Sequence, residues 1–453
     1  MHSTERMSRR ELRASLGLSG VAGLRMLGMF IILPVFALYA RELPGGDDKF
    51  LVGFALGAYG LAQALLQIAF GRLSDRWGRK RTIYLGLAIF AAGSFVAAFA
   101  DDIYMVTLGR ALQGAGAISA AVIALAADLT SDANRTKAMA IIGVTIGAAF
   151  ALSMVIAPVL AGAIGLPGIF AMTGVLALCA AGVVRFVVPA PAEDARRNGE
   201  PVPLSAVLRD GQLMRLNVGI LVLHAMLMAL FVELPLSLEA HLPAQAHWKV
   251  YLPVMLASVA IMVPAMLASE RRGRQKSAFL CSVVVLGAAA AVLGGGAQSL
   301  PWMVAGLVLF FAAFNLLEAS LPSMVTKQAP PAAKGAAIGV YSTLQFVGTF
   351  AGASAAGWLA QHYGREAVFA LCVALAAVWF AVAAGMKPPQ RLATRRYELP
   401  RMAPDRGSGV EAAPARVPGV REVLFSAEGV AYLKVDSAGF DEQNVIRLLA
   451  NVT

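Results

Sequence analysis

Charged residues and cysteines are both scarce in this chain, and each shortage excludes a class of protein. Asp, Glu, Lys and Arg make up 14% of the 453 residues, while hydrophobic residues make up 58%. A soluble domain, by contrast, is about a quarter charged. The apolar residues lie in long blocks, as expected for helices surrounded by lipid. The sequence therefore predicts a membrane protein that crosses the bilayer several times.

Cysteine chemistry and the common catalytic patterns are also lacking. The three cysteines each fall inside an apolar block, without disulfide or metal-ligand spacing, so we expect buried small side chains at Cys179, Cys281 and Cys372. P-loop, Ser/His/Asp and metal-binding helix patterns do not occur. The sequence thus predicts no enzyme, no ATP-driven pump, no metal site and no cofactor, and an ion gradient becomes the expected source of energy.

The net charge of +11 does not indicate a nucleic-acid partner, because of where the charge lies. After Thr394 the chain has eight basic and eight acidic residues, so its last segment is neutral. The excess positive charge belongs to the apolar part, where Lys and Arg orient membrane helices.

Twelve apolar segments are long enough to span a bilayer, which takes about 20 residues. We place them near residues 15–40, 51–73, 82–100, 103–128, 137–162, 166–188, 213–238, 249–269, 276–297, 302–326, 334–361 and 366–386. The predicted domains are a cytoplasmic N-terminus (1–14), a six-helix bundle (15–188), a proline-containing cytoplasmic linker (189–212), a second six-helix bundle (213–386), and a linker with a small domain (387–453).

The distribution of Lys and Arg orients these spans. Basic residues concentrate in the loops of one side, which hold residues 72–81, Arg135, Lys137, Arg196, Arg197, Arg271, Arg272, Arg274, Lys276, Lys327 and Lys334. The loops of the other side hold only Arg41, Lys49, Lys249 and Arg365. Since positive charge is retained in the cytoplasm, both termini are predicted to be cytoplasmic.

Residues 71–81 read GRLSDRWGRKR, with an aspartate framed by two glycines in an otherwise basic loop. A loop that only sets topology needs no aspartate. This segment resembles the major facilitator superfamily, whose loop between the second and third spans has the form G-x-x-x-D-R-x-G-R-K. The resemblance implies a conformational latch, in which the aspartate lies at the start of span eleven and the second arginine reaches the acid that ends span four. Its residues here are Gly71, Asp75, Arg76, Gly78, Arg79 and Asp128.

The two halves of the chain resemble each other, as in transporters built from parallel repeats. Residues 270–275 (ERRGRQ) match residues 75–80 (DRWGRK) in type, and residues 334–339 parallel residues 137–142. The predicted fold class is an all-α membrane protein with the major facilitator fold, of twelve transmembrane helices in two six-helix pseudo-repeats. Small-xxx-small pairs in spans five and eleven predict close helix contacts (Gly143 with Gly147, Gly348 with Gly352). The family resemblance implies that these two spans pack against the opposite half.

Five ionisable residues lie deep within spans, where they are costly and usually face the bundle interior. They fall on spans one, four, seven and ten, which line the central cavity in this family. Arginine stays charged, so Arg25 and Arg110 supply fixed cavity charge or hydrogen bonds. Glu318, Glu233 and His224 can change charge and are the candidates for proton coupling. A helix–helix hydrogen bond by His224, and a static pair of Glu318 with Arg25 or another donor, are the structural alternatives.

Two further patterns bear on the direction of transport. Arg110 belongs to an R-x-x-Q-G pattern that resembles proton-coupled members of the family. Residues 157–162 (APVLAG) keep only the proline and one glycine of the G-P-x-x-G-G pattern of drug antiporters. We expect a proton-coupled efflux antiporter for small, amphipathic molecules that works by alternating access. Proton-coupled uptake of a small polar solute, and a membrane sensor that does not transport, remain the alternatives.

The last segment has the composition of a soluble domain. Strands are predicted near 395–399, 422–425 and 430–435, and a helix with one apolar face at 441–450. With a helix after the first strand, this order resembles a truncated ferredoxin-like α+β unit, similar to heavy-metal-associated domains. Those bind copper through C-x-x-C, and this segment has no cysteine, so no metal is predicted. A facilitator with such a domain resembles multi-pass transporters of the bacterial inner (plasma) membrane. The expected partners are a small-molecule substrate, protons and the lipid bilayer, with the small domain docking on cytoplasmic loops or on a second copy.

Overall fold

The computed structural model describes residues 7–190, 204–296, 298–329, 333–387, 392–398, 417–426, 430–436 and 440–450. The chain divides into two compact units: Met1–Ser269 with Ser277–Met386, and Glu270–Lys276 with Lys387–Thr453. The first unit is a bundle of long helices, and the second contains a small sheet. The helix expected after the first predicted strand falls in residues 399–416, outside the described residues.

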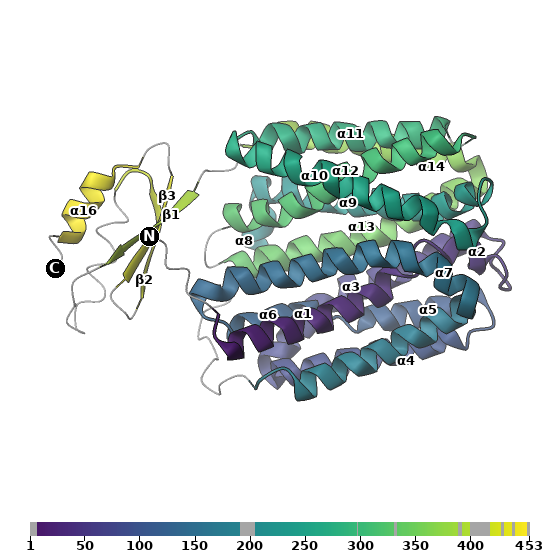
Figure 1. Cartoon of the computed structure of the whole chain (residues 1–453), viewed down its shortest axis with the longest axis horizontal. Coiled ribbons are helices and arrows are strands. Elements are labelled where there is room, and N and C mark those ends of the chain that lie inside the picture. Colours follow the sequence, from purple (N-terminus) through teal and green to yellow (C-terminus); the bar gives the residue numbers. More distant parts are fainter. Residues whose placement is uncertain are drawn as a thin grey trace. The chain divides into compact units, whose positions relative to one another are not determined.

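The first half of the bundle is formed by seven helices, which lie side by side in the purple and blue part of Figure 1. They are α1 (Arg9–Phe30), α2 (Phe36–Ala40), α3 (Lys49–Trp77), α4 (Arg79–Ala98), α5 (Ile103–Ala115), α6 (Ser119–Asp128) and α7 (Asp132–Phe186). Within α7, Gly165 has φ 67° and ψ 178°, so two helical segments meet there at a kink. This kink lies between the fifth and sixth predicted spans.

The second half follows a short helix in the linker, α8 (Leu204–Arg209). It consists of α9 (Gly211–Glu239), the 3-10 turn η1 (Ala244–Ala246), α10 (Trp248–Arg271), α11 (Gln275–Gly295), α12 (Leu300–Gln328), α13 (Lys334–Tyr363) and α14 (Arg365–Ala384). Within the described residues, nine helices are long and apolar enough to cross a membrane. We use "basic end" for the end of the bundle where α3 and α10 end and α13 begins, and "opposite end" for the other.

Aspartates begin several of these helices where the chain enters the bundle. The side chains of Asp48, Asp102 and Asp210 accept hydrogen bonds from the first backbone N–H groups of α3, α5 and α9. These N–H groups have no acceptor within the helix, so a carboxylate that caps them stabilises the helix start. The polar caps therefore set where the apolar spans begin.

Glycines allow α13 to approach two helices closely. A Cβ at Gly348 or Gly352 would lie 2.1 Å and 2.2 Å from carbonyl oxygens of α9, at Leu221 and Ala225. On another face, a Cβ at Gly53 of α3 would lie 2.3 Å from the carbonyl oxygen of Ala353. Small residues at such crossings let backbones pack at short range. The α3–α13 contact joins the two halves of the bundle.

Two expectations about small residues are wrong. A Cβ at Gly143 or Gly147 of α7 would meet nothing within 4 Å, so this pair makes no close helix contact. Gly348 and Gly352 make the close contacts expected of them, with α9, and span eleven (α13) packs against the opposite half as expected, through Ala353 and Gly53. Among the cysteines, Cys372 is buried, but Cys179 and Cys281 are exposed on the surface of the bundle.

The small sheet consists of β1 (Leu392–Glu398), β2 (Val420–Ser426) and β3 (Val430–Asp436), followed by α16 (Glu442–Ala450). Strand β3 lies between the other two and pairs antiparallel with both. Leu433, Val435 and Val445 are buried in its core. Ile446 is 51% exposed, so it lies outside the buried face of α16 that contains Val445.

Candidate functional site

The loop between α3 and α4 is a sharp turn with its own ion-pair cluster. Gly78 has φ 104°, which a residue with a Cβ rarely adopts, and it is both the last cap of α3 and the first of α4. This turn directs Arg79 towards the end of α6, where its Nε donates to the Asp128 carboxylate at 3.1 Å. The same guanidinium donates to Ser74 and Asp75. Arg79 therefore ties α3, α4 and α6 together at the basic end.

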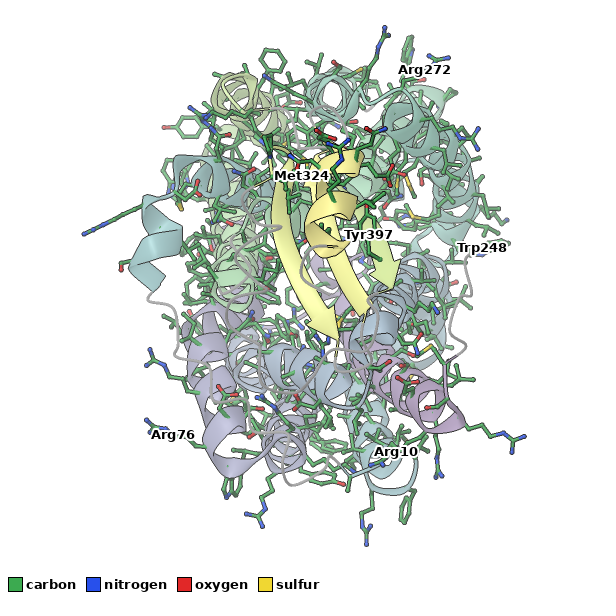
Figure 2. All side chains as sticks on the ribbon, turned by 90° about the vertical axis from the view of Figure 1, so that its left-hand side faces the viewer. Arg10, Arg76, Trp248, Arg272, Met324 and Tyr397 are labelled. Carbon is green, nitrogen blue, oxygen red and sulfur yellow. The ribbon has the colours of Figure 1, made fainter. Side chains whose placement is uncertain are left out.

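Asp75 is the second carboxylate that contacts Arg79. The two side chains form an ion pair, and the Asp75 side chain is 64% exposed. Arg76 is also exposed, and Figure 2, which views the basic end, shows Arg76 and Arg10 at the rim of the bundle. Gly71 lies one turn earlier on α3, where an added Cβ would meet Ala120 at 3.9 Å.

Spans seven and ten bring His224 and Glu318 together in the second half. The Nε2 atom of His224 on α9 lies 3.9 Å from Oε2 of Glu318 on α12. The same nitrogen is 2.8 Å from the side-chain amide of Gln345 on α13, so the predicted helix–helix hydrogen bond of His224 is present. His224 is buried, whereas the Glu318 side chain is 37% exposed. The Oε2 atom of Glu318 that faces His224 is itself buried and has no hydrogen-bond partner, so the exposed part of Glu318 lies elsewhere on its side chain.

Phenylalanines cover this pair and join the two halves. The ring of Phe314, one helical turn before Glu318, lies 6.0 Å from the His224 ring and stacks on Phe150 of α7 at 6.1 Å. Phe150 also contacts Phe311 at 6.0 Å and Phe30 of α1 at 5.0 Å. The polar pair is therefore bounded by an aromatic layer to which α1, α7 and α12 contribute.

Arg25 and Arg110 meet around one tyrosine in the first half. Arg25 donates to the hydroxyl of Tyr59 at 2.9 Å, to Oε1 of Gln63 at 2.6 Å and to Oγ of Ser119 at 2.9 Å. The Arg110 guanidinium lies over the Tyr59 ring, 5.0 Å from its centroid. Arg25 thus pairs with neutral side chains, and the static Arg25–Glu318 pair considered from the sequence does not form.

Glu233 does not join His224 and Glu318, although all three are proton-coupling candidates. Its buried carboxylate lies 3.7 Å from Nζ of Lys49, at the start of α3 in the other half. Nearby, Arg41 and Glu239 form a second inter-half pair at 2.6 Å. The backbone N–H of Lys49 also donates to Gln361 of α13 at 3.0 Å. Glu233 therefore belongs to a group of polar contacts that closes the opposite end.

Sequence reasoning missed the uncharged members of these clusters. Tyr59, Gln63 and Gln113 are 0% exposed, and Gln345 bonds to His224. The sequence prediction did not include them because it selected only arginine, histidine and glutamate inside apolar blocks. A search for amides and hydroxyls inside apolar blocks would have found them, since such groups need partners in a membrane. Among the described residues, no group of three or more His, Cys, Asp or Glu is arranged to hold a metal ion.

The fold and the site together define a multi-pass membrane transporter: two helical halves meet around buried polar residues, as in transporters with parallel repeats. The sequence matches the Major Facilitator Superfamily over residues 18–269 and 243–428, and the chain belongs to this family. It is accordingly a transporter of small molecules and not an enzyme.

Relatives and solved structures agree with that assignment. The chain is 44% identical over 440 residues to the inner membrane transport protein YajR of Escherichia coli, covering 95% of this chain and 96% of that protein. It is 31% identical over 141 residues to the class B tetracycline resistance protein of Escherichia coli, covering 31% of this chain and 34% of that protein. A crystal structure of a bacterial homologue of the lysosomal transporter Spinster, inward-facing and occupied, shares the fold with a TM-score of 0.68 at 13% identity, covering 83% and 97% of the two chains.

Proposed function

We propose that the chain is a proton-coupled secondary transporter that exports small amphipathic molecules by alternating access. The observation that carries this proposal is the placement of Glu318 beside His224, with one side chain partly exposed and the other buried. A group that loads and releases a proton must be reachable by water. It must also contact a structure that responds to its charge. The Glu318 side chain is 37% exposed, and its neighbour His224 also bonds to α13 through Gln345, so the charge of Glu318 acts on a contact between helices.

The contacts between the halves support a conformation that is open at the basic end. At the opposite end, Arg41 pairs with Glu239, and Lys49 pairs with Glu233. Near the basic end of α13, a Cβ at Gly335 or Gly339 would meet nothing within 4 Å. With the basic loops in the cytoplasm, this is an inward-facing state.

The lining residues favour an amphipathic substrate. Phe150, Phe311 and Phe314 are buried against one another and form an apolar layer next to the polar groups of Glu318 and His224. Binding sites for small molecules combine a mostly apolar wall with a few placed polar groups. The similarity to a tetracycline resistance protein over part of the chain supports export rather than uptake.

The decisive experiment measures flux in proteoliposomes with an imposed pH gradient, using a panel of amphipathic compounds. The Glu318→Gln variant keeps the shape but fixes the neutral state, so uphill transport is lost while binding is retained. Glu366→Gln is the control, because this carboxylate is 74% exposed. Wild-type gradient dependence in Glu318→Gln removes the residue from coupling. Gradient-driven uptake of polar solutes supports the first alternative, and no flux of any compound supports a sensor.

Several further features belong to the same proposal. Counting α7 as two segments across Gly165, and pairing α1 with α2 and α5 with α6, gives twelve spans with both termini in the cytoplasm. An inner-membrane location follows from the relationship to YajR. The contacts of Arg79 with Asp75 and Asp128 support the latch at the basic end.

The small domain fits a truncated ferredoxin-like unit. Strand β3 pairs antiparallel with β1 and with β2, so β1 and β2 run parallel with β3 between them. This is the arrangement of a split βαβ unit, in which a helix connects the two parallel strands. We assign this domain a modulatory role, because the membrane helices already form both halves of a transporter.

A further inference from the structure

The first half of the bundle holds two buried positive charges with only neutral partners among the described residues. Arg25 is 2% exposed and Arg110 is 1% exposed. Arg25 donates to Ser119, Tyr59 and Gln63, and Arg110 donates to Gln113 and to the carbonyl of Leu56. The Nε atoms of both guanidinium groups are buried and have no hydrogen-bond partner.

The two charges also lie close together. Arg25 bonds to the hydroxyl of Tyr59, and Arg110 lies over the ring of the same residue, 5.0 Å from its centroid. Arginine remains protonated in proteins, so neither guanidinium group becomes neutral by losing a proton. Burying a charge without a counter-charge is strongly unfavourable, and buried charges are normally paired. The cluster is therefore electrostatically incomplete as it stands.

A break in the fourth span adds further positive character. α5 ends at Ala115 and α6 begins at Ser119, and Arg25 bonds to the side chain of Ser119. The first N–H groups of α6 have no acceptor within the helix and carry its positive dipole end. At the break, the backbone N–H groups of Gly116 and Ala117 donate to the carbonyl oxygens of Gln113 and Ala115. Two of the carbonyl groups that end α5 therefore already have hydrogen-bond partners. Half-helix starts of this kind bind anionic groups in other transporter folds.

We propose that Arg25, Arg110 and the start of α6 form a binding site for a monovalent anion. The ligand is either a free halide or the carboxylate of a transported solute, since both offer a single compact negative charge. The anion accepts hydrogen bonds from the free Nε of Arg25 and from the N–H groups at Ser119. Ser119 is the half-buried member of the site, whereas Tyr59 and Gln63 are fully buried.

The hydrogen bonds around the site hold the two arginines in place without neutralising them. Gln113 presents its Oε1 to Arg110, because its Nε2 donates to Ser94 Oγ at 2.8 Å. Gln63 likewise directs Oε1 towards Arg25 and Nε2 towards Gln67. The amides therefore orient the donors and leave the positive charge available to a ligand. The test of this site does not depend on the proposed proton coupling, because anion binding is measured without transport.

The test is the thermal unfolding of the purified full chain in detergent at constant sodium concentration. Chloride, bromide or benzoate replaces the bulky HEPES anion. A saturable rise in unfolding temperature with an added anion is expected for the wild type. Arg25→Gln should raise the half-saturating concentration at least tenfold. Arg72→Gln, at an exposed arginine outside the cluster, should leave it unchanged.

The arms of this experiment separate the two ligand sources. Stabilisation by chloride and bromide identifies a free halide, and stabilisation by benzoate alone identifies a solute carboxylate. If no anion stabilises the wild type, or if Arg25→Gln responds as the wild type does, the site does not exist. Should Arg25→Gln fail to fold, anomalous diffraction from wild-type crystals grown in bromide decides instead. A bromide peak beside Arg25 supports the site, and its absence overturns it.

Discussion

The Nε atom of Arg79 lies 3.1 Å from the carboxylate of Asp128, and this contact fixes the turn after α3 to the end of α6. Both side chains are partly buried, at 24% and 19% exposure, so water screens their attraction less than that of a surface pair. Asp75 contacts the same guanidinium but is 64% exposed. The three residues form a rigid unit with one carboxylate left accessible at the basic end.

If the accessible carboxylate completes a latch when the basic end closes, Asp75→Asn should slow transport without reducing the amount of folded protein in the membrane. A latch that biases two states by about 1–3 kcal/mol changes their ratio roughly 5- to 150-fold. We expect Asp75→Asn to reduce flux in proteoliposomes by roughly 5- to 150-fold. Arg72→Gln should transport normally. Normal transport by Asp75→Asn would leave the loop with a role in topology only.

The ion pairs at the opposite end should stabilise the conformation described here. The exposed Arg41–Glu239 pair contributes roughly 0–1 kcal/mol, whereas removing Lys49 should cost more, because it leaves the buried Glu233 carboxylate without its partner. We expect Lys49→Gln to shift the population towards opening at this end more than Arg41→Gln does. Spin labels at Glu42 and Ala240 would report the separation of the halves. Equal distance distributions in both variants and the wild type would contradict a closing role.

Glycine substitutions in the bundle should have opposite outcomes at two places. Gly352→Val places a side chain against the carbonyl of Ala225, where a Cβ would lie 2.2 Å away, so α9 and α13 must separate. Overpacking of this kind costs about 1–3 kcal/mol. Gly143→Ala meets nothing within 4 Å and should be tolerated. Thermal unfolding in detergent compares the two, and equal stability of both variants would rule out the close α9–α13 packing.

Glu11 should make stability depend on acid pH. Although burial opposes ionisation, hydrogen bonds from Ser131 and Ser8 lower the pKa of Glu11 from 4.5 to about 2. A carboxyl group whose pKa is lowered by folding stabilises the folded state above its unfolded pKa and loses that contribution as the pH falls. Glu11→Gln should therefore be less stable than the wild type from pH 5 to 8, and the difference should shrink between pH 4.5 and 2. A difference in unfolding temperature that is constant down to pH 2 would exclude this titration.

Removal of the small domain should leave transport measurable. In its described residues the core is small and includes Leu433, Val435 and Val445, and the membrane helices contain the candidate site. We expect a chain that ends at Pro389 to insert, fold and carry out gradient-driven flux, with an altered response to salt or to a cytosolic ligand. Complete loss of flux in a stable, correctly inserted truncation would make the domain part of the transport cycle.

The sequence by itself was enough to identify the family and the kinds of residue in the site. Long apolar blocks depend only on composition, and the turn containing Asp75, Gly78 and Arg79 depends on residues close together in the chain. Ionisable residues inside apolar blocks stand out for the same reason, so Arg25, Arg110, His224, Glu233 and Glu318 were found. Strand and helix predictions in the small domain also coincide with β1, β2, β3 and α16.

Only the tertiary structure decided which of these residues meet. Arg25 and Ser119 are 94 positions apart, and no local pattern predicts that they bond across α1 and α6. The separation of Glu233 from the pair of His224 and Glu318 depends on how α9 lies against α3 and α12. Gly143 and Gly348 have the same local spacing, yet only Gly348 meets another helix. Contacts between distant segments depend on how whole helices pack, and hydropathy reports only how apolar each segment is.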